Sequence, residues 1–212
     1  MTAAAARWVI AGGGTGGHVT PALALAERIA ARGDSLCLMG SERGLETRLV
    51  PEAGFELVLL RSGQIMGRGV LGRIGAIFAM AWGVVTAWRE LGARRAEIVI
   101  SVGGYASVPA VLAAVLRLLP VALVEPNARP GRSNRATARF ARGVFVQFEE
   151  AIAALGRDRK RVQVVGSTHT KTDCKWQVGV LANFTDVVLK FFTPTSFMPG
   201  DTHTRDHVNH AT

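Results

Sequence analysis

A glycine-rich stretch near the start of the chain, GGGTGGHVTP at residues 12–21, combines residue types that bind anions and move protons. Five of its first six residues are glycine, which lets a ligand approach the backbone closely. A helix that starts here offers unpaired N–H groups and the positive end of its dipole, so it can bind a phosphate. Thr15 adds a hydroxyl group. His18 titrates near neutral pH, so it can act as a general base or orient a ligand.

Three of these glycines also satisfy the G-x-G-x-x-G spacing of dinucleotide-binding turns. A dinucleotide site needs an acidic residue at the end of the second strand, where it holds the ribose. Gly40 and Ser41 occupy that place, and Glu42 comes slightly late. The sequence therefore disfavours a nicotinamide or flavin cofactor.

A second glycine pair follows the same plan in VISVGGYASVPAVLAAVL, where an apolar strand leads through Gly103 and Gly104 into a helix. Tyr105 and Ser107 could add hydroxyl groups, although a lone tyrosine is as often a packing residue. Two such turns at the carboxyl ends of parallel strands can line one crevice. Together they suit a diphosphate, which needs several backbone donors.

A third polar element, VEPNARPGRSN, follows the next expected strand. It places Glu125, Asn127 and Asn134 on the same side of the sheet as the two glycine turns. The same composition is also typical of an ordinary turn rich in proline, asparagine and glycine.

Short apolar runs separated by helix-length segments must position these residues. Strands that are apolar throughout and alternate with helices are typical of a parallel sheet covered on both faces. The sequence therefore predicts an α/β fold, a doubly wound Rossmann-like parallel sheet. The expected strands are Trp8–Ala11, Leu36–Met39, Leu57–Leu60, Ile98–Val102, Val121–Val124, Val144–Val146 and Val162–Val165.

The composition changes after Gly166. Residues 1–166 hold 20 arginines and one lysine, whereas residues 167–212 hold one arginine, three lysines and four of the five histidines. We expect a folded domain over 1–166 and an off-pattern, irregular tail over 167–212, either a second region or a frame-shifted end. Three tail histidines (His203, His207 and His210) do not make a convincing metal site, so we expect no metal.

The overall composition limits the class of protein. A hydrophobic content of 49% supports a sizeable core, and a net charge of +9 favours anionic partners. The arginines are scattered and no nucleic-acid-binding motif is present, so we expect no nucleic acid partner. Cys37 and Cys174 are the only two cysteines, which suits buried thiols in a reducing, cytoplasmic compartment.

An uncharged stretch of fifteen residues, from Ile74 to Trp88, is flanked by arginines. It is shorter than the ~20 residues that span a bilayer. Its residues fit a core helix and a helix at a lipid headgroup surface equally well. The candidate membrane contacts are Ile74, Phe78, Trp82, Trp88, Arg73 and Arg89.

Four stretches in this order and spacing resemble the N-terminal half of the bacterial lipid I N-acetylglucosaminyltransferases (MurG). They are GGGTGGHVTPALALA, GLETRLVPEAGFE, VISVGGYASVPAVLAA and EPNARPGRSNR, within roughly residues 7–166. The resemblance implies one half of a two-domain glycosyltransferase of the GT-B type. Its reaction moves N-acetylglucosamine from UDP-N-acetylglucosamine to undecaprenyl-diphosphate-muramyl-pentapeptide (lipid I), with inversion, giving the peptidoglycan precursor lipid II.

The resemblance also implies roles for individual residues, no cofactor and no catalytic metal. His18 matches a histidine that may serve as the base, and Asn127 matches a sugar-nucleotide contact. The other implied substrate-binding residues are Thr15, Gly16, Gly17, Gly103, Gly104, Tyr105, Glu125 and Asn134. Because the family's acceptor is membrane-bound, the resemblance favours peripheral attachment to an anionic membrane, at the cytoplasmic face of the bacterial inner membrane.

Two departures from the family pattern stand out. The third element reads Val-Glu-Pro-Asn where the family has His-Glu-Gln-Asn, and the segment after Gly166 does not continue the family pattern. We therefore expect the donor-binding domain to be absent and this chain alone to have little transferase activity. The alternative is a non-catalytic membrane-surface module that binds a lipid diphosphate.

Overall fold

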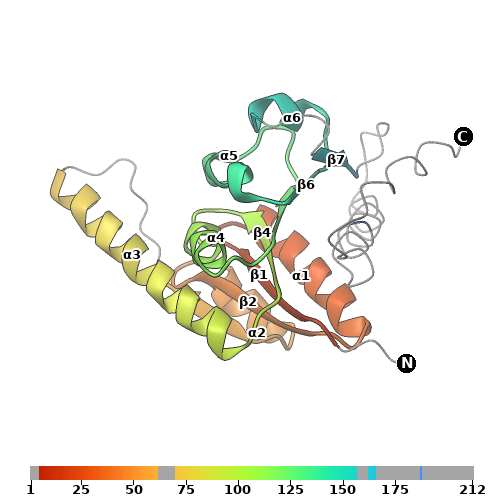
Figure 1. Ribbon diagram of the computed structural model, residues 1–212, viewed down its shortest axis with the longest axis horizontal. Coiled ribbons are helices and arrows are strands. Elements are labelled where there is room, and N and C mark those ends of the chain that lie inside the picture. The colour runs from red at the N-terminus through yellow and green to blue at the C-terminus, as the bar shows by residue number, and fades with distance from the viewer. Residues whose placement is uncertain (1–4, 62–69, 157–161, 166–186, 188–212) are drawn as a thin grey trace, which may run out of the picture.

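Seven short apolar segments pair into one parallel sheet in the computed structural model, which describes residues 5–61, 70–156, 162–165 and 187 (Figure 1). The strand order is β3-β2-β1-β4-β5-β6-β7. This confirms the predicted doubly wound sheet and all seven expected strands. The strands are β1 (Arg7–Gly12), β2 (Ser35–Ser41), β3 (Leu57–Leu60), β4 (Ile98–Gly103), β5 (Val121–Glu125), β6 (Gly143–Val146) and β7 (Val162–Val164).

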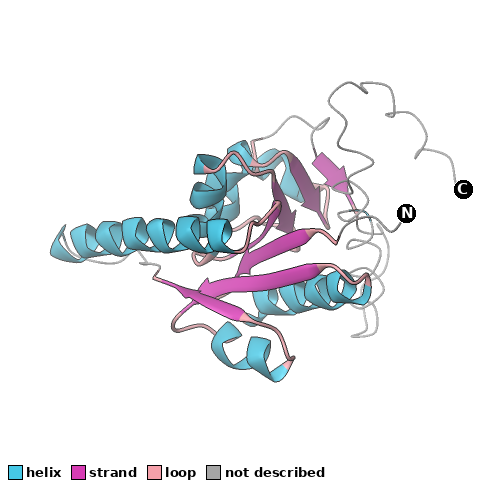
Figure 2. Cartoon of the chain, turned by 60° about the horizontal axis from the view of Figure 1, so that its bottom comes forward, coloured by secondary structure: helices cyan, strands magenta, loops and turns pink. Residues whose placement is uncertain are grey.

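Helices connect the strands, because a parallel connection must cross one face of the sheet. Figure 2 shows the strands between the long helix on one face and two helices on the other. The helices are α1 (Gly16–Ala31), α2 (Glu46–Glu52), α3 (Val70–Ala93), α4 (Ser107–Leu116), α5 (Arg132–Thr137) and α6 (Glu150–Ala154), with a short 3-10 helix, η1 (Ala138–Phe140).

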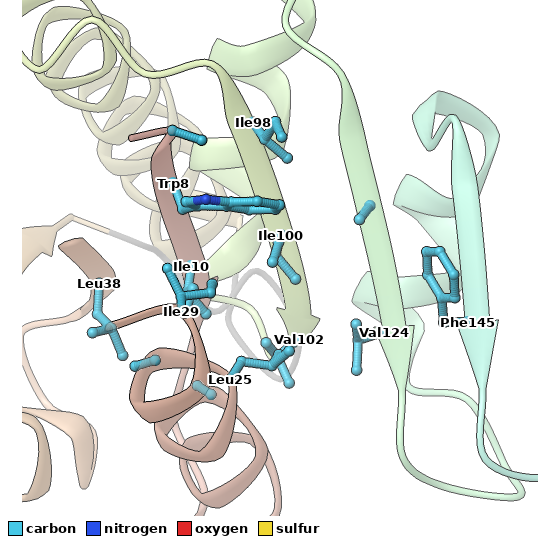
Figure 3. Close-up of a cluster of buried hydrophobic side chains, with 14 of the residues drawn as sticks. Trp8, Ile10, Leu25, Ile29, Leu38, Ile98, Ile100, Val102, Val124 and Phe145 are labelled. Carbon is cyan, nitrogen blue, oxygen red and sulfur yellow. The ribbon is translucent and has the colours of Figure 1, made fainter. Parts of the chain in front are cut away.

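One face of the sheet packs against α1. Trp8 and Ile10 of β1 point to this face, and Leu25 and Ile29 of α1 lie over them (Figure 3). All four are fully or almost fully buried. Burying one such aliphatic side chain stabilises the fold by about 1.5–3 kcal/mol.

The opposite face packs against α3 and α4. Val9 and Ala11 alternate with the residues of the first face, as strand geometry requires, and lie in a cluster with Ala87 and Leu91 of α3 and Ala110 of α4. Burial on both faces explains why the strands are apolar throughout.

The strand order reverses between β1 and β4. The chain passes from β1 to β2 on one side, and β4 later pairs with the other side of β1. Gly12 pairs with Gly103 after an irregularity that follows Ala11. The carboxyl ends of β1 and β4 therefore lie side by side at a topological switch point, where open α/β sheets bind their ligands.

The domain boundary expected after residue 166 stays a prediction. Val165 is buried in the cluster on the α1 face, directly after β7. The expected tail, residues 167–212, lies outside the described residues except for Val187, which is partly buried against the same cluster.

Candidate functional site

The two glycine turns contact each other through their backbones. A Cβ atom on Gly104 would lie 2.1 Å from the carbonyl oxygen of Gly13, and Gly104 has a φ of +79°. Both the space and the conformation therefore demand glycine at this position. The structure thus brings together the two turns that the sequence predicts at one ligand side.

Side chains close the contact between the turns. The ring of Tyr105 lies against Gly14, where a Cβ would be 3.0 Å from its Cε1 atom. Ser107 is buried and donates its hydroxyl hydrogen to the carbonyl oxygen of Gly104 at 2.9 Å. The hydroxyl of Ser107 therefore stabilises the second turn, which differs from the expected ligand contact.

The first turn of α1 begins at this contact. Thr15 is the N-cap residue with an extended backbone, and its side chain makes no capping hydrogen bond. The N–H groups of Gly16 and Gly17 belong to the first turn, where a helix offers no acceptor of its own. An anion at this end of α1 would receive both donors and the favourable helix dipole.

His18 lies in the same turn, beside the second glycine turn. Its Nδ1 is 2.9 Å from Oγ1 of Thr15. Its Cδ2 atom is 2.9 Å from the position of a Cβ on Gly103. Burial lowers the pKa of His18 below its usual value, although the carboxylates of Glu125 and Glu46 act in the opposite direction. The imidazole is therefore neutral at neutral pH, as a general base must be.

Glu125 is the last residue of β5 and belongs to the third polar element. It is fully buried, and its carboxylate accepts hydrogen bonds from the backbone and side-chain nitrogens of Asn127, both at 2.9 Å. It also accepts from the Gly131 backbone N–H at 3.2 Å and from Nδ2 of Asn134 at 2.8 Å. Through these hydrogen bonds the carboxylate of Glu125 fixes the conformation of the loop from Asn127 to Gly131.

Asn134 and Asn127 differ in accessibility. Asn134 is 1% exposed, and its Oδ1 is a buried acceptor with no hydrogen-bond partner in the described part of the chain. The whole side-chain amide of Asn134 lies against the second turn, with Nδ2 at 2.9 Å and Oδ1 at 3.1 Å from the position of a Cβ on Gly103. Asn127 remains exposed at the surface of the loop.

Sequence reasoning missed Glu46. It is 1% exposed, and its carboxylate accepts hydrogen bonds from the Gly14 N–H and from the N–H and hydroxyl of Ser41. Glu42, which comes slightly late in the sequence for a ribose contact, lies 3.7 Å from the guanidinium of Arg61. The available signal was the glutamate in GLETRLV, placed just after a strand that ends in glycine and serine.

The described residues offer neither a cluster of metal ligands nor a reactive thiol. Among the described residues, no group of three His, Cys, Asp or Glu side chains could hold a metal ion. A cavity of about 170 Å³ lies at the other end of β1 and β2, next to Cys37. Burial raises the pKa of the Cys37 thiol to about 11, so this predicted buried cysteine stays protonated and unreactive.

The outer side of α3 is apolar. Phe78 is 72% exposed and Trp82 is 58% exposed, and Figure 1 shows the start of α3 projecting away from the sheet. Ile74 is exposed on the same side, and so is Arg89. Large exposed apolar patches of this kind mark binding surfaces. The side chain of Arg73 lies outside the described residues.

Two observations qualify this surface. The guanidinium of Arg117 stacks on the ring of Trp88 at 4.1 Å, so one face of that expected membrane contact is covered. Ile74–Ala93 is long and apolar enough to cross a bilayer, with a mean hydropathy of 1.2. Core helices of soluble proteins meet the same criterion, and Ala87 and Leu91 of α3 are buried in the core.

Comparison with known proteins agrees with this geometry. Residues 8–146 match the glycosyltransferase family 28 N-terminal domain. Two curated relatives are named UDP-N-acetylglucosamine--N-acetylmuramyl-(pentapeptide) pyrophosphoryl-undecaprenol N-acetylglucosamine transferase. The one from Myxococcus xanthus is 42% identical over 161 residues, which are 75% of this chain and 42% of the relative. The one from Pelobacter propionicus is 43% identical over 145 residues, which are 68% of this chain and 38% of the relative.

A solved structure agrees as well. The crystal structure of Acinetobacter baumannii MurG superimposes with a TM-score of 0.64 and 25% sequence identity, covering 80% of this chain and 47% of that one. The chain spans less than half the length of these relatives. The family match covers the sheet from β1 to β6 and both glycine turns. This chain therefore belongs to glycosyltransferase family 28 and carries its N-terminal domain.

Proposed function

We propose that this chain is the acceptor-binding part of a glycosyltransferase that acts on a lipid-linked diphosphate sugar. By analogy with its relatives, the donor is UDP-N-acetylglucosamine and the acceptor is lipid I, so the product is lipid II of peptidoglycan synthesis. The observation that carries this proposal is the backbone contact between the turns at Gly13 and Gly104, beside the start of α1.

The acceptor diphosphate binds across the two turns. Gly16 and Gly17 supply backbone N–H groups from the first turn of α1. In the second turn Gly104 is partly exposed, and Gly103 beside it is buried. The hydroxyls of Thr15 and Tyr105 and the exposed amide of Asn127 complete the set that faces the substrates. Glu125 and Asn134 act indirectly, because both are buried and hold the loop that carries Asn127.

His18 removes the proton from the attacking hydroxyl. In the inverting step the acceptor oxygen forms a bond to C1 of the donor sugar, while the bond between C1 and the UDP oxygen breaks. The hydroxyl proton passes to the free ring nitrogen of His18, and UDP leaves with the bonding electrons. General-base help of this kind contributes about 10²–10⁴ in rate.

The exposed side of α3 attaches the protein to an anionic membrane surface, at the cytoplasmic face where lipid I would be presented. The apolar side chains of Ile74, Phe78 and Trp82 enter the headgroup region, and Arg89 attracts anionic lipid. Arg73 and Trp88 belong to the same proposed contact.

Binding of a soluble lipid I analogue to the purified chain tests the proposal. We expect saturable binding that inorganic pyrophosphate displaces, as measured by calorimetry or NMR titration. Gly104→Ala, which obstructs the contact between the turns, should abolish it. Absence of binding by the wild-type chain would refute the acceptor role.

Transfer itself is tested in a hybrid enzyme. Residues 8–146 of this chain replace the matching segment of the Myxococcus xanthus relative, and turnover is measured with UDP-N-acetylglucosamine and the analogue. His18→Gln in the hybrid should lower kcat by about 10²–10⁴ with little change in acceptor affinity. A rise in KM of similar size with kcat unchanged would assign His18 to binding. A hybrid that binds both substrates without turnover would favour the non-catalytic alternative.

A further inference from the structure

Glu46 joins the end of β2 to the first glycine turn. Its carboxylate accepts a hydrogen bond from the Gly14 backbone N–H at 2.8 Å. It also accepts one from the Ser41 backbone N–H at 2.8 Å and one from the Ser41 hydroxyl at 2.7 Å. Only 1% of the residue is exposed. One buried side chain thus connects the end of β2 to Gly14, which lies 32 residues before Glu46 in the sequence.

Three glycines make room for this carboxylate. A Cβ atom on Gly13, Gly40 or Gly44 would lie 2.2, 2.5 or 1.9 Å, respectively, from a side-chain atom of Glu46. Real Cβ atoms do not approach other atoms so closely. These three glycines are therefore needed to accommodate the side chain of Glu46, whatever ligand the turn binds.

The charge of Glu46 makes its position unexpected. Burial acts to raise the pKa of this carboxyl, but the hydrogen bonds from Gly14 and Ser41 outweigh burial and bring the pKa below its usual value. The group is therefore a carboxylate at neutral pH. A negative charge beneath a turn that binds a diphosphate opposes the ligand by Coulomb repulsion, so an electrostatic benefit to binding does not explain it.

We propose that Glu46 is a positioning residue that holds the Gly14 N–H inward and thereby fixes the direction of the N–H groups at Gly16 and Gly17. The charge-assisted hydrogen bond to Gly14 is the stronger kind, and it is protected from water. With Gly14 committed to the interior, an anion at this turn is left with the donors of the first turn of α1. The effect on ligand binding rests on the proposed diphosphate role, whereas the structural role of Glu46 does not.

Amide hydrogen exchange of the full chain tests the structural part. In Glu46→Gln the Gly14 and Ser41 amides should exchange about tenfold faster or more, because the neutral amide gives weaker bonds. Exchange in the core of β1 and β4 should stay unchanged. Glu42→Gln is the matched control, because Glu42 is an exposed glutamate four residues away that contacts Arg61. Unchanged Gly14 exchange in a folded Glu46→Gln protein would overturn the proposal.

The effect of Glu46→Gln on the affinity for inorganic pyrophosphate tests the functional part, because the two explanations predict changes in opposite directions. Removing a negative charge near an anion site should by itself tighten binding. If Glu46 positions the donors, Glu46→Gln should instead weaken binding by about tenfold, the effect of one misdirected hydrogen bond to a charged group. Binding that is equal or tighter would overturn the proposal, whereas Glu42→Gln should bind no more weakly than the wild type.

The two proposals can fail independently. If the wild-type chain does not bind pyrophosphate, the proposed function fails, and the exchange at Gly14 still decides the role of Glu46. If Glu46→Gln does not fold, Glu46→Asp decides, because it keeps the charge and shortens the reach by one methylene group. We expect Glu46→Asp to lose Gly14 protection, and retained protection would count against the proposal.

Discussion

Thr15 and His18 are joined by a 2.9 Å hydrogen bond between Oγ1 and Nδ1 within the first turn of α1. This bond occupies one ring nitrogen and leaves the other for the neighbourhood of the two glycine turns. A hydroxyl can donate to Nδ1 or accept from Nδ1–H, so the direction of this bond depends on the tautomer of His18. The proposed base function requires the proton on Nδ1 and a free Nε2.

Replacing Thr15 by valine should therefore shift the tautomer of His18. Valine keeps the branched shape but has no hydroxyl, so Nδ1 loses its partner. We expect the Nε2–H form to increase by about three- to tenfold, as for the loss of one ordinary hydrogen bond. The ¹⁵N chemical shifts of the imidazole measure this directly. Thr15→Ser keeps the hydroxyl and is expected to leave the tautomer unchanged.

Stability should fall as the solution becomes acidic, starting near pH 6.5. The pKa of His18 in the folded protein is lowered, mainly by burial, relative to an unfolded value of about 6.5. The unfolded chain therefore binds the proton more readily, and stability is lost as pH falls from the unfolded pKa toward the folded pKa. Denaturant unfolding between pH 5 and 8 measures the slope. His18→Gln should flatten it, and an unchanged slope would contradict this assignment.

The contact between the turns predicts a large cost for Gly104→Ala. The new methyl group would lie 2.1 Å from the carbonyl oxygen of Gly13, so the two turns must separate. Gly54 is the control, because its φ of +80° matches the +79° of Gly104 and its Cβ position has nothing within 4 Å. We expect Gly104→Ala to lower the free energy of unfolding by about 1–3 kcal/mol more than Gly54→Ala, as overpacking does. Equal losses would indicate that the turns separate freely.

Membrane attachment through α3 predicts that its most exposed aromatic residues matter most. Trp82→Ala and Phe78→Ser should weaken sedimentation with anionic liposomes by about fivefold or more each, since each removes a large exposed apolar area that membrane binding would bury. Binding of the wild type should weaken as salt rises. Leu45→Ala is the control, because Leu45 is 46% exposed beside α2, away from α3. Equal effects of all three substitutions would remove α3 from the interface.

Much of this fold could be predicted from the sequence. Burial on both faces makes strands such as Val9–Ala11 apolar throughout, and that pattern is visible without any structure. The two glycine turns were also predictable, because a chain that turns sharply and touches another backbone needs glycine. Their mutual contact followed from the rule that ligands bind where the strand order reverses.

The buried carboxylates could not be predicted in the same way. Glu125 and Glu46 occur in polar loop sequences, which usually indicate solvent exposure or a ligand contact. Their burial depends on donors that the fold delivers from elsewhere, such as the Gly14 N–H for Glu46 and Nδ2 of Asn134 for Glu125. Side-chain hydrogen bonds between distant segments leave no periodic signal in a single sequence.

The pairing of Gly12 with Gly103 has a consequence for how the protein folds. The two halves of the candidate site come from segments that are about ninety residues apart, with α1, β2, α2, β3 and α3 between them. Contacts of such high sequence separation form slowly, because closing the long loop costs chain entropy before the contacts can stabilise the fold. The proposed anion-binding surface therefore does not exist in the early nascent chain, and it is completed only when β4 has docked beside β1.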